Sequence, residues 1–402
     1  MKRSFPIAAF LDILRGGPLF RTWMIALTIG AIAGCVAYFV QLRDGLIVTN
    51  MTDQVSWGAY IANFTFIGGV AAAAITVVVP AYGYRLLPFR KIAFVGESMA
   101  FTGMAMCLLF VTVDIGRPDR AWHLVPFWGS LNFPTSLLAW DVVILNGYLV
   151  INAAMLFFML RARYLGRSPS RLYVPLVFGS MAWAIGIYLV EAFLYNWLGA
   201  RPYWNAAIIA PRFIASAFVS GPALIVLTLR VMERALAFHV SDDVIRLYRR
   251  LVTVALLVDL FLFAAEVFTS LYGGAAHGAP MRFLLFGAHG NPGVRAYVWV
   301  GIALSLISTA VLLSPLRRRP WVFEAMCVLV VVAVWIEKGM ALIVPGFVPT
   351  PLGEIADYVP SVVETFVSLG VWCMGLILFT VLLRLGVRIE TGQLRATVEP
   401  AE

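Results

Sequence analysis

Acidic side chains and one lysine interrupt several long apolar segments of this sequence, and they are the residues most able to do chemistry. An ionisable side chain inside a membrane-length apolar segment is costly, so such residues usually face a bundle interior or a water-filled path and mark routes for protons or ions. Those within or at the ends of the apolar segments are Glu97, Asp114, Asp141, Glu191, Asp259, Glu266, Glu324, Glu337, Lys338 and Glu364.

Helical spacing places some of these residues on common faces. Asp259 and Glu266 are seven positions apart, which is about two helical turns. Glu191 lies three positions after Tyr188 and four before Tyr195. Such faces can carry protons, and the predicted proton path consists of Glu97, Glu191, Asp259, Glu266 and Lys338.

An alternative interpretation is that these groups are interhelical ion pairs with a structural role. Lys338 would then neutralise Glu337 or Glu266, because a buried charge needs a partner. The clustering of the group favours a functional path more than any single residue does.

The segment 114–123, Asp-Ile-Gly-Arg-Pro-Asp-Arg-Ala-Trp-His, is the densest in chemical groups. A quinone head group needs hydrogen-bond partners at its oxygens and a group that takes up protons when quinol is oxidised. We predict Asp114 and His123 as catalytic residues, with Arg117 and Trp122 beside the head group. Alternatively, the two arginines of the segment pair with its two carboxylates and cap the preceding helix.

Histidine and cysteine placement argues against metal cofactors held by this chain. The histidines His123, His239, His277 and His289 fall in loops or near segment ends, whereas a b-type haem needs facing histidines within spans. The four cysteines form no Cys-x-x-Cys pair. We therefore expect no haem, no iron–sulfur cluster and no metal site, and a P-loop for nucleotides is also missing from the sequence.

The elements that must position these groups are membrane-spanning helices. Of 402 residues, 61% are hydrophobic and 13% are charged, about half the charged share of a soluble chain. Lipid offers backbone groups no partner, so apolar runs of about 20 residues must be helical. We predict an all-α, polytopic membrane protein forming a single domain over residues 1–402. The ten predicted spans are 21–42, 56–84, 91–114, 136–162, 171–197, 208–236, 246–273, 294–314, 320–344 and 360–386.

The order of these spans permits a simple arrangement. Spans two to five and spans six to nine are predicted to form two four-helix bundles, flanked by spans one and ten.

The distribution of Lys and Arg predicts the orientation. Alternate ends of the spans hold 22 and 7 of these residues, and the richer side faces the cytoplasm. We predict that residues 1–20 form a cytoplasmic lead-in, that 387–402 form a cytoplasmic tail, and that the loops 115–135 and 274–293 face outward. Most of the buried acidic groups then lie toward the outer face. The net charge of +9 follows from this topology and does not indicate nucleic acid binding.

Several motifs resemble one membrane-protein family. The segment 114–123 and Trp57-Gly-Ala-Tyr-Ile61 resemble NrfD-like subunits, the polysulfide reductase membrane subunit family. The stretches 335–340, 345–354 and 358–361 are similar to its ten-helix branch, which includes the hydrogenase-2 membrane subunit and DsrP.

The resemblance implies a cofactor-free quinone or quinol site, for menaquinol or ubiquinol, near the outer face of a bacterial inner membrane. It also implies a periplasmic ferredoxin-like iron–sulfur subunit and a further redox catalytic subunit as partners. We predict quinol between spans two to five, with Trp57 and Tyr60 at the head group and Asp141 as a third catalytic residue beside Asp114 and His123.

Two other functional classes stay open. A secondary transporter or proton-translocating subunit also uses membrane carboxylates, and it typically has broken helices and a midplane site. A non-catalytic anchor would only hold redox partners at the membrane.

Overall fold

Long helices make up nearly all of the protein. The computed structural model describes residues 16–125, 128–167, 171–273, 275–287, 293–348, 355 and 358–394. These residues contain no β-strand, and ten of their helical segments are long and apolar enough to cross a membrane. The predicted all-α membrane fold is therefore confirmed, because lipid leaves helices as the way to satisfy the backbone of such segments.

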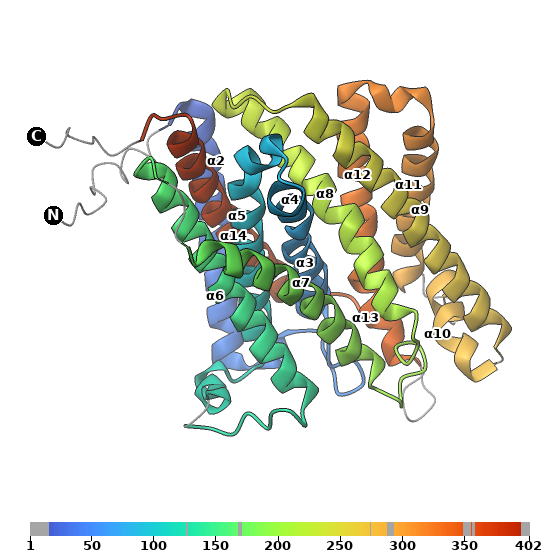
Figure 1. The fold of residues 1–402 in the computed structure, drawn as a ribbon. Coiled ribbons are helices and arrows are strands. Elements are labelled where there is room, and N and C mark those ends of the chain that lie inside the picture. The colour runs from blue at the N-terminus through green and yellow to red at the C-terminus, as the bar shows by residue number, and fades with distance from the viewer. Residues whose placement is uncertain are drawn as a thin grey trace, which may run out of the picture.

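The first bundle is built from spans two to five (Figure 1). Span two is composite, and the other three are continuous helices. Spans three and five pack against span two, and span four packs against spans three and five. Span two lies at the centre of the protein, since 83% of its most apolar 18-residue stretch is buried. The members of the bundle are α3 (Ala59–Ala72) with α4 (Ile75–Val78) and η2 (Val79–Gly83), α5 (Leu87–Asp114), α6 (Leu137–Tyr164) and α7 (Tyr173–Asn196).

The second bundle is built from spans six to nine and contacts the first where α3 meets α8. Its members are α8 (Ile209–Leu236), α9 (Asp242–Tyr272), α11 (Gly293–Leu313) and α12 (Pro320–Lys338), the last extended by α13 (Met340–Ile343) and η5 (Val344–Phe347). The predicted loop 274–293 is wrong in part, because α10 (Ala275–Phe286) occupies most of it. This helix is too short to span a membrane, so hydropathy over a membrane-length window does not reveal it.

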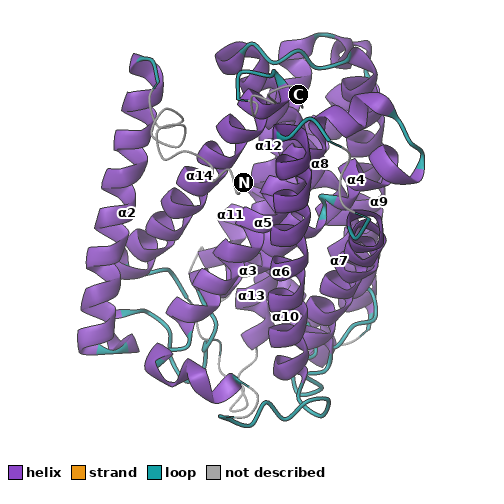
Figure 2. Ribbon diagram, turned by 60° about the vertical axis from the view of Figure 1, so that its left-hand side comes forward, coloured by secondary structure: helices purple, strands orange, loops and turns teal. Residues whose placement is uncertain are grey.

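The first and last spans pack on each other at one edge of the molecule (Figure 2). They are α2 (Pro18–Asp44) and α14 (Val362–Glu390), and α14 also lies against α5. Their closest approach is glycine on glycine, since a Cβ built on Gly34 would overlap the Cα of Gly370. Small residues allow such close backbone packing in lipid. The pair therefore flanks the first bundle, through the contact of α14 with α5.

Two spans that the sequence predicts as continuous are interrupted. In span two, the helix breaks at Ala73–Ala74 and becomes a π-turn from Val79, where Pro80 has no amide hydrogen to donate. In span nine, α12 ends at Lys338, and Gly339 takes a non-helical conformation (φ −90°, ψ −106°) before α13. Ala73, Ala74 and the helical turns after Gly339 are buried, so protein surrounds both breaks, as irregular backbone in a membrane requires.

The start of α2 and the end of α14 lie at the same end of the bundle, here named the terminal end (Figure 1). The opposite end is named the distal end. The Lys- and Arg-rich connections lie at the terminal end. Residues 1–15 and 395–402 of the predicted tails lie outside the described residues, and α14 continues through Glu390 into the segment predicted as tail.

Candidate functional site

An aromatic cavity of about 420 Å³ opens at the distal end. Its walls come from three segments: the turn before α3, the loop after α7 and the turn η5 after α13. A cavity of this size, with four aromatic residues in its lining, suits a flat organic ring. The lining residues are Ser56, Trp57, Trp197, Leu198, Gly199, Ala200, Arg201, Trp204 and Phe347.

The walls of the cavity are held by ring contacts and by bonds to the backbone of α13. The ring of Trp204 lies 5.4 Å from that of Trp57 and 5.0 Å from that of Phe347, measured between centroids. Its indole Nε1 donates a 2.9 Å hydrogen bond to the carbonyl of Leu342. The Arg201 guanidinium lies over the Phe347 ring at 5.1 Å. Because Trp204 and α13 fix each other, the cavity is preformed.

Tyr195 connects the cavity to the first bundle. Its ring packs edge-on against Trp57 at 5.6 Å, and its hydroxyl lies 2.6 Å from that of Thr65 in α3. One turn deeper on α7 lies Glu191, which is fully buried. Tyr188 follows, with its hydroxyl 3.4 Å from the Gly69 carbonyl. The predicted common face of these three α7 residues is confirmed, and it points at α3.

Glu191 is positioned by a gap in α3. A Cβ built on Gly68 would overlap the Oε1 atom of Glu191, so only glycine leaves room for this carboxylate. Neither carboxylate oxygen has a hydrogen-bond partner among the described residues. Asp141 of α6 is buried nearby and interacts electrostatically with Glu191. The predicted catalytic Asp141 therefore lies with Glu191.

Lys338 approaches α3 from the second bundle. A Cβ on Gly69 would lie 2.6 Å from its Nζ atom, which also lies 4.2 Å from the centre of the Phe213 ring. Glu191 has the strongest electrostatic effect on Lys338 among the charged groups, and Asp259 the next. Consecutive glycines of α3 thus bring a carboxylate from one bundle close to an amine from the other.

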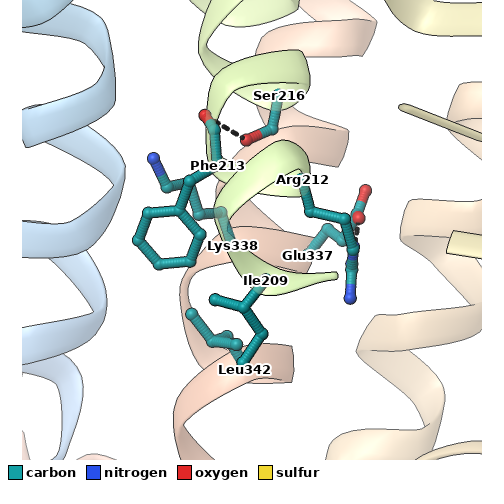
Figure 3. Close-up of a pocket in the computed structure, with 7 residues that line it drawn as sticks. All are labelled: Ile209, Arg212, Phe213, Ser216, Glu337, Lys338 and Leu342. Carbon is teal, nitrogen blue, oxygen red and sulfur yellow. Dashed lines mark hydrogen bonds and ion pairs between the residues drawn. The ribbon is translucent and has the colours of Figure 1, made fainter. Parts of the chain in front are cut away.

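Arg212 forms an ion cluster that the sequence did not indicate. Arg212 lies in the first turn of α8 and pairs with both Glu266 and Glu337. The alternative in which Lys338 neutralises these carboxylates is therefore wrong. Figure 3 shows the reason: Glu337 points toward Arg212, while the neighbouring Lys338 points the other way, past Phe213. In the sequence Arg212 resembles a loop cation, because it lies so near the start of the predicted span at position 208.

Two of the four acidic residues of α9 face this cluster together. Asp259 and Glu266 are both buried, and Asp259 interacts electrostatically with Glu337, Arg212 and Lys338. Their predicted common face is confirmed. A cavity of about 20 Å³ between α8 and α12, lined in part by Ser216 and Lys338, is large enough for one water molecule.

Tyr60 and Asp114 lie on the other side of the start of α3. The Tyr60 hydroxyl donates a 2.5 Å hydrogen bond to Gln41, which in turn donates to the carbonyl of Val113. Asp114 is close enough to interact electrostatically with Tyr60, and one of its oxygens is buried without a hydrogen-bond partner among the described residues. The structure thus brings these two predicted residues together, beside Gln41 of α2.

The capping box at the start of α14 lies next to Tyr60 and contains the buried residue Glu364. Glu364 accepts hydrogen bonds from the backbone amides of Asn50 and Ser361 and from the Tyr358 hydroxyl. That hydroxyl accepts a 2.8 Å hydrogen bond from the amide of Ala59. Burial and the nearby Glu364 raise the pKa of Tyr358, so Tyr358 stays neutral and can donate.

Most of the rest of the 114–123 segment is exposed. His123 and Trp122 lie on the short helix η3 (Pro118–Leu124), with their ring centroids 3.9 Å apart. Arg117 binds Asp119 through two nitrogens, at 3.0 and 3.1 Å, and the hydrogen bond from Arg117 lowers the pKa of Asp119. No hydrogen bond in the described part of the chain joins His123 to Asp114. The predicted head-group residues thus occupy three places: η3, the Asp114 group and the Glu191 group.

Glu97 lies nearer the terminal end. It is fully buried and accepts a 2.9 Å hydrogen bond from Tyr173, whose hydroxyl lies 2.7 Å from that of Tyr82. This short chain of hydroxyl groups leads from Glu97 to the π-turn of span two. Within the described ranges, no cluster of three or more His, Cys, Asp or Glu side chains is arranged to hold a metal ion.

Comparison with known proteins points to membrane components of redox enzymes. The family model described as polysulphide reductase, NrfD, matches residues 47–349. The chain is 22% identical to a selenate reductase subunit of Mesobacillus selenatarsenatis, over 91% of this chain and 94% of that protein. It is 26% identical to a putative dimethyl sulfoxide reductase membrane subunit of Halobacterium salinarum, over 89% of each. The Hdr-like menaquinol oxidoreductase integral membrane subunit of Archaeoglobus fulgidus is 22% identical, over 91% of this chain and 93% of that one.

Proposed function

The chain belongs to the NrfD polysulphide reductase family, and from this membership we propose that it is the subunit of a respiratory redox complex that oxidises or reduces a quinone. The aromatic cavity at the distal end carries the proposal. Its volume of about 420 Å³ lies in the usual range for small-molecule sites, and such sites combine apolar walls with a few polar groups. The similarity to a menaquinol oxidoreductase subunit favours menaquinone as the ligand.

Trp57 and Trp204 would pack against the head group at the cavity wall, because aromatic rings prefer offset or edge contacts with one another. Their own centroids lie 5.4 Å apart, so the head group would contact the pair rather than lie between the two rings. Arg201 would donate to a quinone oxygen, since its guanidinium lies at the cavity wall. We assign no redox cofactor to this chain, so electrons would pass between the quinone and a partner subunit.

Protons would move through Tyr195 and Glu191. Quinol oxidation releases two protons, and an acceptor must lie within hydrogen-bond reach directly or through a water. Tyr195 contacts both the cavity residue Trp57 and the hydroxyl of Thr65, and Glu191 lies one turn further on the same face. Glu191 is free to accept a proton because neither of its oxygens has a hydrogen-bond partner in the described structure.

We place the distal end at the outer face of a bacterial inner membrane, with both termini in the cytoplasm. The support is the excess of Lys and Arg at the terminal end. A periplasmic ferredoxin-like iron–sulfur subunit would then dock at the distal end and connect the quinone to a further catalytic subunit. Relatives named as subunits of selenate and dimethyl sulfoxide reductases support assembly with redox partners.

The interrupted spans are the observation that favours a transporter instead. Broken helices beside buried charges are typical of secondary transporters, and α3 and α12 fit that description. The aromatic cavity lies at one end rather than at midplane, and the relatives carry redox names, so we favour quinone chemistry. A non-catalytic anchor would have no use for either feature.

Equilibrium dialysis of the purified full chain against a short-chain menaquinone tests the proposal. We expect saturable binding that weakens about two- to tenfold in Trp57→Leu, because losing one aromatic contact costs about 0.5–1.5 kcal/mol. The matched control is Trp321→Leu, an exposed tryptophan at the terminal end, which should leave binding unchanged. Absence of saturable binding would reject the quinone function and leave the transporter or the anchor.

A further inference from the structure

Glu191 and Lys338 are buried ionisable groups that the fold leaves without conventional partners. Both Glu191 oxygens and the Lys338 Nζ atom have no hydrogen-bond partner within the described residues, although both residues are buried. An unpaired buried charge costs several kcal/mol, so a purely structural role would favour replacing such groups with apolar ones. Their retention is explained if the two groups act on each other.

Two consecutive glycines of α3 make room for the ionisable ends of Glu191 and Lys338. Gly68 leaves room for the carboxylate and Gly69 for the amine, and a Cβ at either position would lie within 2.6 Å of the ionisable atom. Successive residues of a helix point about 100° apart, so the two groups meet α3 at one level on adjacent faces. The Tyr188 hydroxyl reaches the Gly69 carbonyl at the same level.

A further buried carboxylate, Asp259 of α9, belongs to the second bundle. Asp259 interacts electrostatically with Lys338, and one of its buried oxygens also has no hydrogen-bond partner in the part of the chain described. Lys338 lines the water-sized cavity between α8 and α12 (Figure 3). The break at Gly339 lies directly after Lys338. Glu337 is paired with Arg212, whereas the Lys338 Nζ atom has no hydrogen-bond partner among the described residues.

We propose that Glu191 and Lys338 pass protons between the two bundles across the Gly68–Gly69 gap, linking the quinone cavity to Asp259. The inference rests on the proposed function, which supplies the quinone. When quinone takes up two electrons from the redox partner, Tyr195 relays a proton from the Glu191 carboxyl to a quinone oxygen. The Lys338 ammonium then gives a proton to the Glu191 carboxylate, and the Asp259 carboxyl restores the ammonium. Glu191 gives a second proton through Tyr195 to the other quinone oxygen, so that quinol formation leaves both Glu191 and Asp259 as carboxylates. Quinol oxidation reverses each step.

Infrared difference spectroscopy of the purified full chain with bound short-chain menaquinone, reduced at an electrode, tests this route. The expected spectrum contains quinone bands and carboxyl changes from two residues, assigned by their loss in Glu191→Gln and Asp259→Asn. In Lys338→Arg the positive charge stays but cannot be released, so the Asp259 change should vanish while the quinone bands and the Glu191 change persist. Lys338→Met and Gly69→Ala should give the same result.

The control variant is Gly103→Ala, which crowds α3 at Ala71 with a similar 2.7 Å contact but touches neither charge. It should retain both carboxyl changes. An Asp259 change that survives in the Lys338 variants, or that is missing from the unsubstituted chain, would overturn the route while the quinone bands stand. A spectrum without quinone bands would instead overturn the proposed function and the inference with it.

Discussion

Arg212 shows how one residue can tie two helices together in a membrane bundle. It lies at the start of α8, is nearly buried and neutralises carboxylates from α9 and α12. A buried ion pair contributes little net stability, but removing one partner leaves the other charge uncompensated. Removing Arg212 should therefore destabilise the protein more than the intact ion cluster stabilises it.

We expect Arg212→Met to lower the free energy of unfolding in detergent by about 3–5 kcal/mol, because Glu266 and Glu337 would both lose their cation. Urea denaturation monitored by circular dichroism measures the change. The matched control is Arg234→Met, which breaks an exposed pair with Glu324 and should cost at most about 1 kcal/mol. Equal losses for the two variants would contradict the assigned role of Arg212.

Two carboxylates compete as the proton acceptor for quinol. The position of the cavity predicts that Glu191→Gln lowers quinol-linked electron transfer by about 10²-fold while quinone still binds, as expected for loss of a general base. The sequence pattern instead predicts this loss for Asp114→Asn and His123→Ala. Steady-state turnover of the three variants in the assembled complex decides between them. A large loss of turnover in Asp114→Asn, with normal turnover in Glu191→Gln, would indicate that the head group lies on the Tyr60 side of α3.

The helices themselves were largely predictable, but their interruptions were not. Each predicted span corresponds to an observed one, because about 20 apolar residues suffice to identify a crossing. The apolar pattern runs unbroken through Ala73, so hydropathy carries no sign of that break. Gly339 is visible in the sequence, yet a single glycine inside a helix is usually tolerated. The helix α10 was not predicted because it is short.

Site residues were predicted less well, for a physical reason. Helical spacing correctly placed Tyr188, Glu191 and Tyr195 on one face, because those relations are local. The approach of Lys338 to Glu191 depends on how two bundles pack at Gly68 and Gly69, and no local pattern encodes it. The cavity is likewise assembled from three separate segments, of which the sequence indicated only the one that holds Trp57.

The crossing of α2 and α14 gives a test at the scale of elements. Gly34→Ala should destabilise the chain by about 1–3 kcal/mol, the usual cost of overpacking, because the new Cβ would meet the Gly370 backbone. Thermal unfolding in detergent measures the effect. Gly179→Ala in α7 is the control, since nothing lies within 4 Å of its built Cβ. If both variants melt alike, the two helices do not pack as described.

At the scale of the whole molecule, the ten candidate spans of the described residues put the start of α2 and the end of α14 on one side of the membrane. The charge bias favours the cytoplasm as that side. Reporter fusions at residue 402 should therefore be active in the cytoplasm, and fusions within 115–135 should be active outside. The reversed pattern would place the distal end and its cavity at the inner face, and a periplasmic partner could then not dock there.

Photolabelling of the purified full chain by a menaquinone with an azide on its ring, followed by peptide mapping, tests the quinone site most directly. The account predicts labels on the segments 56–57 and 197–204, and their loss when excess unlabelled menaquinone competes. Competed labels confined to 114–123, or to α9 and α11, would contradict the placement of the quinone in the aromatic cavity.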